Sequence, residues 1–217
     1  MASMGNVGRV VSVNVAVPRT GEWTGRMGRT GIDKRPAGGP ILLESTGVRG
    51  DTVVDTDRHG RWFQAVYGFD IEDFEHWSAE LGIPLGAGNA GENLTLSGTD
   101  CSNALVGERW AVGEAVLRVT GPRTPCRVFA AYWSSADLIK RFTAFGRPGA
   151  YFAVERPGEV RPGDVVRVLS RPEHGVSVAQ VFAVRSGGRG KLAEHVCGAL
   201  ADLPPEWAEH VAAAVSG

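Results

Sequence analysis

Glycine and proline recur along the whole chain, and this distribution limits how long any helix or strand can be. The 217 residues contain 30 glycines and 12 prolines, which separate short apolar runs instead of gathering in one linker. Because both residues mark turns and interrupt regular structure, the pattern predicts many short elements joined by turns. Short elements at close spacing favour a fold that is mainly β with some α.

Short runs of β-branched and other apolar residues predict strands over most of the first 170 residues. Alternating valines predict an opening strand over 10–17, because successive side chains of a strand point to opposite faces. A loop is expected over 21–39, which is rich in Gly, Arg and Thr. The other expected strands cover 41–43, 64–67, 93–96, 109–112, 115–120, 151–154 and 164–169. This spacing suits a β-barrel with crossing connections.

Apolar residues at helical spacing predict two helices among these strands. Ile71, Phe74, Trp77 and Leu81 share one face of a helix over 70–81, and Asp70 can cap its first turn. The second helix is expected over 135–143.

The last part of the chain is expected to be helical. The segments 176–184, 191–203 and 205–215 carry alanines and valines, and the glycine-rich stretch 186–190 between the first two reads as a flexible joint. We therefore divide the chain into a β-barrel domain over 1–170 and a helical C-terminal extension over 171–217. The extension is expected to cover a pocket or to serve in a homodimer interface.

The overall charge argues against large polyanionic partners. Lys and Arg number 23 and Asp and Glu number 24, so no global field would draw the protein to nucleic acid or to a membrane surface. The three cysteines lack CxxC spacing and read as reduced thiols rather than a disulfide framework or a structural zinc site. We find no signal peptide and no apolar run that would span a membrane, and we expect a cytoplasmic protein.

Cys126 is the first candidate for a functional residue, because it ends the run Pro-Arg-Thr-Pro-Cys over 122–126. Proline fixes the backbone φ angle, so the two prolines present the thiol in a defined direction. Arg123 and Arg127 stand on either side, and nearby cations favour the thiolate, which attacks electrophiles and binds soft metals. Core packing is the alternative reading, and it suits Cys197 better than Cys126.

Two further polar segments are candidates for the same site. The turn 91–95 (Gly-Glu-Asn-Leu-Thr) either presents Glu92 and Asn93 to a ligand or simply opens a strand. His59 follows aspartates at 51, 55 and 57, which form either a metal site or a solvated turn.

Cations in loops and at strand ends form the third group of candidates. If the barrel gathers three of them, they would bind a phosphate or another oxyanion; otherwise they are scattered surface charge. They are Arg29, Lys34, Arg35, Arg49, Arg58, Arg61, Arg123 and Arg127.

Taken in order along the chain, these segments resemble the MOSC domain family, the module named after the C-terminal part of molybdenum cofactor sulfurase. They look most like its stand-alone bacterial YiiM-like branch, and the resemblance covers about residues 8–170. The matching landmarks are residues 31–36 (GIDKRP), 39–40 (GP), 47–51 (GVRGD), 59–60 (HG), 65–67 (AVY), 91–95 (GENLT), Gly107 with Gly113, and 122–126 (PRTPC).

The resemblance implies a β-barrel of the pyruvate-kinase-barrel-like type, with a pocket lined by these loops. The family's hallmark cysteine falls on Cys126, which is a molybdenum ligand in metal-binding relatives and is thought to handle sulfur in the sulfurase setting. Arg61 stands where the family often has glycine, and it would fill part of the pocket or contact a carboxylate substrate. The residues expected to bind the cofactor or an anionic substrate are Lys34, Arg49, Arg61, Glu92, Asn93, Arg123 and Arg127.

Three functions follow from this resemblance. The first is a molybdenum-cofactor enzyme in which Cys126 binds the metal and which performs oxygen-atom chemistry such as the reduction of N-hydroxylated compounds, with a redox partner supplying electrons. The second is metal-free sulfur transfer or C–S cleavage, with Cys126 as nucleophile or persulfide carrier and His59 as proton donor. The third is a non-catalytic cofactor carrier. The substrate is expected to be a small anionic or sulfur-containing molecule. We expect no pyridoxal phosphate on this chain, although a sulfur-donor partner would carry it.

Overall fold

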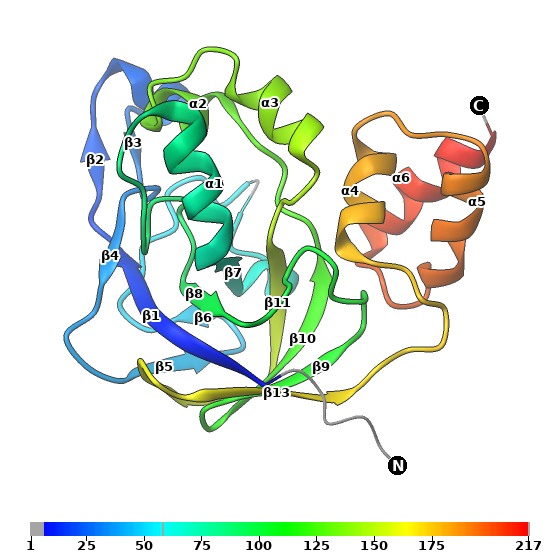
Figure 1. Ribbon diagram of the computed structural model, residues 1–217, viewed down its shortest axis with the longest axis horizontal. Helices are drawn as coiled ribbons and strands as arrows, with labels where there is room; N and C mark the ends of the chain where they lie inside the picture. The colour runs from blue at the N-terminus through cyan, green and yellow to red at the C-terminus, as the bar shows by residue number, and fades with distance from the viewer. Residues whose placement is uncertain (1–6, 58, 217) are drawn as a thin grey trace.

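The computed structural model describes residues 7–57 and 59–216, and its centre is a closed β-barrel (Figure 1). Within these residues, seven strands follow one another around the barrel in the order β13-β9-β10-β11-β7-β8-β1, and β1 pairs back with β13 to close it. They are β1 (Gly8–Ala16), β7 (Val66–Asp70), β8 (Leu94–Ser97), β9 (Arg109–Val112), β10 (Ala115–Gly121), β11 (Ala150–Arg156) and β13 (Val165–Ser170). The predicted fold class, mainly β with helices at the C-terminus, is confirmed.

The barrel pairs its strands antiparallel except between β7 and β8. Parallel neighbours need a crossover connection, and helix α1 (Ile71–Leu81) provides it. Phe74 and Trp77 bury the apolar face of α1, as the spacing predicts. Asp70 does precede the helix, but its carboxylate bonds elsewhere and makes no side-chain cap.

Segment 21–39 is not the simple loop that we expected. It contains the 3-10 helix η1 (Glu22–Met27), and β3 (Arg29–Thr30) pairs with β2 (Arg19–Thr20). The strand β4 (Lys34–Pro36) pairs with the end of β1. These pairings are made across the chain, so local composition gives little sign of them.

Several further elements complete the barrel domain. A small sheet joins β5 (Ile41–Glu44), β6 (Gly47–Val48) and β12 (Gly158–Val160). The strand expected over 64–67 begins two residues later, as β7, after the 3-10 helix η2 (Trp62–Gln64). The helix expected over 135–143 is α3 (Leu138–Phe145), and α2 (Arg127–Tyr132) is a helix that the sequence did not predict.

The C-terminal extension is helical, as predicted, and α4 packs against β10 (Figure 1). Its elements are α4 (Val178–Arg185), α5 (Lys191–Val196), the 3-10 helix η3 (Cys197–Ala199) and α6 (Pro205–Ser216). The helix expected over 191–203 is therefore divided near Gly198. The apolar core runs from the barrel into the extension, and the division of the chain at residue 170 stays a prediction.

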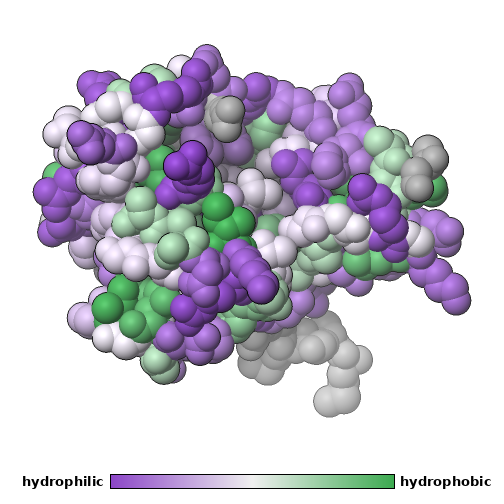
Figure 2. All heavy atoms as spheres, turned by 90° about the horizontal axis from the view of Figure 1, so that it is seen from above, coloured by the Kyte–Doolittle hydropathy of each residue, from purple (hydrophilic) through white to green (hydrophobic). Residues whose placement is uncertain are grey.

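The surface is mostly hydrophilic on the face seen from above, with hydrophobic side chains gathered in patches (Figure 2). The large apolar residues that are exposed include Trp23, Met27 and Trp62. No helix in the described part of the chain is long and apolar enough to cross a membrane.

Candidate functional site

Cys126 lies between strand β10 and helix α2, where it is the residue that precedes the helix. Its backbone is extended, with φ −132° and ψ 169°, and its side chain is partly buried against the hydrophobic core. All three cysteines are free thiols, and Cys101 is fully buried, whereas Cys126 is partly exposed. Cys126 therefore combines a fixed position with access from solvent.

Arg123 is the most unusual cation near Cys126. Only 7% of it is exposed, and its Nη1 donates to the backbone oxygen of Ala90 at 2.6 Å. Its guanidinium carbon lies 3.9 Å from the ring centroid of Phe129 and 5.3 Å from that of Tyr67. Within the described residues, no carboxylate lies within 4.0 Å of its guanidinium nitrogens.

The groups around Cys126 stabilise the positive charge of Arg123. Burial opposes this charge, yet the pKa of Arg123 is raised because Tyr67, Tyr151 and Cys126 favour the cation. A buried guanidinium that rests on aromatic faces without a carboxylate has donors left for an anion. The arrangement therefore suits a negatively charged ligand beside the thiol.

Lys34 lies close to Arg123 but has a carboxylate partner of its own. Its Nζ contacts Asp51 Oδ2, and Asp51 also accepts from the backbone N–H of Ala16 at 2.7 Å and from Asn93 Nδ2 at 2.8 Å. Burial lowers the pKa of Lys34, Asp51 opposes that shift, and the charge of Arg123 adds to it. Lys34 and Asn93 thus belong to one buried polar cluster around Asp51.

Glu92 is fully buried and holds the turn before β8. Its Oε1 accepts from the Gly88 N–H at 2.5 Å and from Thr95 Oγ1 at 2.6 Å, and its Oε2 accepts from the Ala90 N–H at 3.0 Å. Burial raises the pKa of Glu92 to about 7, although these donors favour the carboxylate. Since the carbonyl of Ala90 receives Arg123, Glu92 positions the arginine through the backbone.

Asn93 forms part of the same framework. Its Oδ1 accepts from the Tyr67 N–H at 3.2 Å, and its Nδ2 also reaches the Asn14 carbonyl at 3.3 Å. These bonds link β1, β7 and β8 at the place where the polar turn begins. The structure therefore brings Lys34, Glu92, Asn93 and Arg123 together, and Arg123 is the member of this group that interacts with Cys126, while their roles toward a ligand stay predictions.

Three of the other predicted site residues make different contacts. Arg49 is exposed and pairs with Glu44 at 2.9 Å. Arg127 is exposed in the first turn of α2. Arg61 pairs with Glu206 of α6, at a hollow of about 620 Å³ that η2 and the start of α6 also line.

His59 is exposed, and its backbone N–H donates to the Asp55 carbonyl at 3.0 Å. Asp51 bonds to Lys34, and Asp55 and Asp57 both contact Arg26. No group of three or more His, Cys, Asp or Glu residues that could hold a metal ion occurs among residues 7–57 and 59–216. Asp51 lies in the buried cluster with Lys34, whereas Asp57 and His59 are exposed, so the solvated-turn interpretation fits Asp57 and His59 but not Asp51.

Two residues near the site, Tyr151 and Asp33, were missed by the sequence analysis. Tyr151 reads as an ordinary strand residue, and nothing in its sequence context sets it apart. Asp33 has a clearer signal, because it directly precedes two basic residues, Lys34 and Arg35. Only 1% of Asp33 is exposed, and it accepts from Arg19 Nε at 2.6 Å, Arg35 Nε at 2.9 Å and the Tyr132 hydroxyl at 2.9 Å. Asp33 thereby ties the segment before β4 to helix α2.

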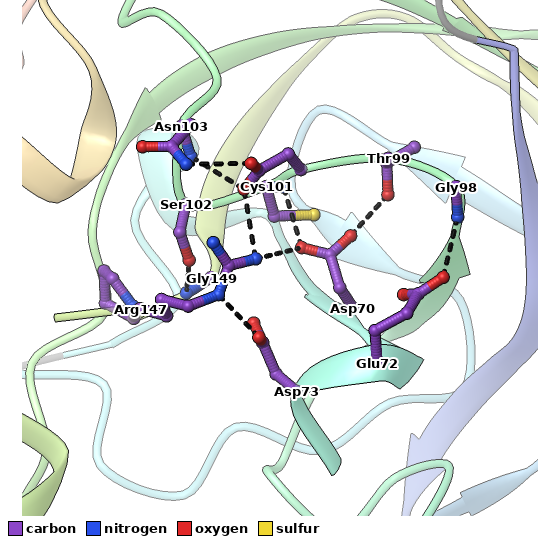
Figure 3. Close-up of polar contacts among 12 residues, drawn as sticks. Asp70, Glu72, Asp73, Gly98, Thr99, Cys101, Ser102, Asn103, Arg147 and Gly149 are labelled. Atoms are coloured by element: carbon purple, nitrogen blue, oxygen red, sulfur yellow. Dashed lines mark hydrogen bonds and ion pairs between the residues drawn. The ribbon is translucent and has the colours of Figure 1, made fainter. Parts of the chain in front are cut away.

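Cys101 belongs to a second polar cluster, which joins the start of α1 to the loop after β8 (Figure 3). Arg147 donates to Asp73 Oδ1 at 2.6 Å and to Asp100 Oδ1 at 3.1 Å. Asp70 accepts from the Cys101 N–H at 2.8 Å, and burial raises its pKa to about 6. Burial also raises the pKa of the Cys101 thiol, which makes Cys101 a poor nucleophile.

The fold and the site define a class of closed β-barrel proteins in which a partly exposed cysteine stands beside a buried arginine. Residues 55–167 match the family model described as the MOSC domain. The chain therefore belongs to the MOSC domain family, and the predicted resemblance is confirmed.

Relatives of known sequence or structure agree with this membership. A Bacillus subtilis protein, YflK, is 36% identical over 169 residues, which cover 78% of this chain and 76% of YflK. The crystal structure of YiiM from Geobacillus stearothermophilus matches with a TM-score of 0.78 and 26% identity, over 96% of this chain and 99% of that one.

A third relative is much longer than this chain. A Gibberella moniliformis protein named Reductase is 30% identical over 157 residues, which are 70% of this chain. The chain spans only 28% of the length of that protein. Most of the fungal protein therefore has no counterpart here.

Proposed function

We propose that this MOSC-domain protein binds the molybdenum cofactor through Cys126 and reduces N-hydroxylated compounds. The observation that carries the proposal is the buried guanidinium of Arg123, which interacts with Cys126 and has no carboxylate partner among the described residues. A soft thiolate and an uncompensated cation side by side suit a ligand that contains both a soft metal and a phosphate.

The residues beside Cys126 fit such a cofactor. Cys126 would supply the metal ligand. Arg123 would bind the phosphate with the guanidinium N–H groups that do not donate to the Ala90 carbonyl. Lys34 would add positive charge near the same anion, although Asp51 already offsets part of it. Glu92 and Asn93 would act indirectly, since their hydrogen bonds hold the backbone that carries Arg123 and Lys34.

The bound cofactor would supply the two-electron chemistry. Reduction of an N–OH group takes two electrons and two protons and yields N–H and water. Because the electrons must come from outside this chain, we propose a separate redox partner protein. The name of the fungal relative, Reductase, and its much greater length support a reduction that needs additional protein.

His59, Arg49, Arg61 and Arg127 enter the proposal as outer residues. All four are exposed, so they can meet a substrate or a partner at the surface. His59 would be the proton donor for the substrate.

Elemental analysis tests the proposal. Wild type, Cys126→Ala and Cys197→Ala are produced in a host that makes the cofactor and receives molybdate. We expect molybdenum in the wild type and in Cys197→Ala, and its loss in Cys126→Ala. Cys197 is a matched control because it is also a partly buried free thiol, and it lies in η3.

The two alternative functions give different results. The molybdenum proposal would be contradicted if the protein holds no metal and turns over a sulfur substrate only when Cys126 is present. That result would support sulfur transfer or C–S cleavage with Cys126 as nucleophile. Full molybdenum occupancy without turnover of any tested electron donor and acceptor would support a cofactor carrier.

A further inference from the structure

Phe129 of helix α2 presents its ring to the buried guanidinium of Arg123. The guanidinium carbon lies 3.9 Å from the ring centroid of Phe129, closer than the 5.3 Å to the ring centroid of Tyr67. Phe129 is fully buried, and so is nearly all of Arg123. Because a cation is attracted more strongly to an aromatic face when water is excluded, Phe129 holds the guanidinium as well as filling the core.

Trp133 connects the Phe129 ring to the loop before β8. Its ring centroid lies 4.5 Å from that of Phe129, and its Nε1 donates to the Asn89 carbonyl at 2.7 Å. The next carbonyl along the loop, that of Ala90, accepts from Arg123 Nη1 at 2.6 Å. Trp133 thus fixes both the aromatic face and the backbone acceptor that Arg123 uses.

These contacts leave Arg123 with donors for a ligand. Its Nε and Nη2 make no hydrogen bond within 3.5 Å in the described part of the chain. Neither of these two nitrogens is sealed from solvent. An anion can therefore reach both of them beside Cys126, and a planar guanidinium can bind phosphate oxygens with two donors at once.

Arg123 can bind such an anion only while its long side chain stays in one conformation. The apparent affinity of a ligand falls with the fraction of the protein that is in the binding-competent conformation. No carboxylate of the described residues lies within 4.0 Å of the Arg123 guanidinium nitrogens to hold them in place. The aromatic face of Phe129 and the Ala90 carbonyl must therefore keep this side chain in position.

We infer that Phe129 and Trp133 are positioning residues for anion binding beside Cys126. Phe129 holds the guanidinium of Arg123 against the face of its ring, and Trp133 fixes that ring to the loop that carries the Ala90 carbonyl. Arg123 then presents Nε and Nη2 to a phosphate group. The inference rests on the proposed function, in which Arg123 binds the phosphate of the cofactor.

Protection of Cys126 from alkylation measures this anion binding without molybdenum. All proteins carry Cys197→Ser, and this protein is called the parent, because Cys197 is also partly exposed, whereas Cys101 is buried. The proteins are produced without molybdate and treated with iodoacetamide at fixed pH and increasing inorganic phosphate, at constant ionic strength set with sodium chloride. We expect saturable protection of the parent and none in Arg123→Gln.

Phe129→Leu is the variant that tests the positioning role, and Phe142→Leu is its matched control. Both phenylalanines are fully buried and their ring centroids lie 5.4 Å apart, but the guanidinium of Arg123 lies over the ring of Phe129. Phosphate should protect Phe129→Leu about tenfold more weakly than the parent, and Phe142→Leu as strongly as the parent. Equal weakening in both variants would show a structural role alone and would overturn the inference.

A second variant keeps the test usable if Phe129→Leu does not fold. Trp133→Phe retains a ring beside Phe129 but loses the bond to the Asn89 carbonyl, so it should also weaken protection. Equal protection of the parent, Phe129→Leu and Trp133→Phe would overturn the inference. The same conclusion would follow if phosphate gave the parent no protection up to roughly 50 mM.

Molybdenum analysis of the parent, produced with molybdate in a host that makes the cofactor, separates this inference from the proposed function. A parent that holds molybdenum, together with equal protection in all variants, would overturn the positioning role alone. The expected pattern of protection in a parent that acquires no molybdenum would overturn the proposed function and support the positioning role.

Discussion

The clearest energetic prediction concerns the buried carboxyl of Glu92. Its pKa rises from 4.5 to about 7 in the folded protein, chiefly because burial penalises the charged form. Between these two pH values the folded protein holds a proton that the unfolded chain has lost. The free energy of unfolding must therefore fall as pH rises from about 4.5 to about 7.

The size of the effect follows from the two pKa values. The difference between 4.5 and about 7 corresponds to about 3 kcal/mol, since a tenfold change in proton affinity is worth about 1.4 kcal/mol. Of this, about 2 to 3 kcal/mol falls between about pH 5 and about pH 8. Because the Glu92 side chain is fully buried, solvent screening reduces this free-energy difference only slightly.

Glu92→Gln removes the titration but keeps the shape of the side chain. Urea denaturation of both proteins at a series of pH values gives the difference in unfolding free energy. We expect the wild type to lose about 2 to 3 kcal/mol relative to the variant between about pH 5 and about pH 8. Asp70, with its pKa at about 6, has the same sign of effect, but it is present in both proteins and cancels.

The variant should also be less stable than the wild type at about pH 5, because Gln has only one oxygen acceptor and the Ala90 N–H loses its partner. A constant difference between the two proteins across the whole pH range would refute the reasoning. It would mean that Glu92 keeps the same charge in the folded and unfolded states at each pH.

Three further changes have expected effects on stability, each measured by urea denaturation. Gly121→Ala should cost about 1–3 kcal/mol, because the new methyl group would overlap the Trp207 ring and Gly121 has a φ of +150°. Trp207→Ala should cost about 3–5 kcal/mol through the cavity that it leaves, and a loss below about 1 kcal/mol would show that the extension is loosely packed. Arg147→Met should cost about 3 kcal/mol at neutral pH by leaving Asp73 buried without its cation, and less in acid, where Asp73 gains a proton. An equal loss at both pH values would contradict the assigned ion pair.

Local pattern was sufficient for the elements that carry their own apolar periodicity. The opening valines form β1 as predicted, with Val10 and Val13 buried and Val11 exposed, but burial does not alternate strictly because the pairing with β8 shifts register between Val10 and Ser12. Helix α1 likewise buries Phe74 and Trp77, as the helical spacing requires. In both cases the residues that face the core are close together in the sequence, so a short window contains the signal.

Helix α2 shows why other elements escaped prediction. It has only six residues, which is too few for a helix that is stable by itself. Its Phe129 contacts the guanidinium of Arg123, which lies outside the helix. The segment 21–39 is similar, because β4 forms only when Lys34 and Arg35 pair with β1. Contacts between distant segments decide these elements, and the sequence gives no direct record of them.

The sequence likewise identified some residues of the candidate site, but not how they contact one another. Cys126 and Arg123 follow from their motif, and Lys34, Glu92 and Asn93 from the resemblance. That Glu92 points inward, whereas Arg49 pairs with Glu44 at the surface, depends on how the loops fold against the barrel. The uncompensated charge of Arg123 could be recognised only once the carboxylates of the folded chain had been located.

X-ray absorption at the molybdenum edge tests the central proposal most directly, because it reports the atoms bound to the metal. Wild-type protein from a cofactor-producing host is compared with Cys126→Ser, with Cys197→Ser as the control. We predict a sulfur contribution from the protein in the wild type and the control, and its loss in Cys126→Ser. Identical sulfur coordination in all three proteins, or wild-type protein that holds no molybdenum, would contradict the proposal that Cys126 is the metal ligand.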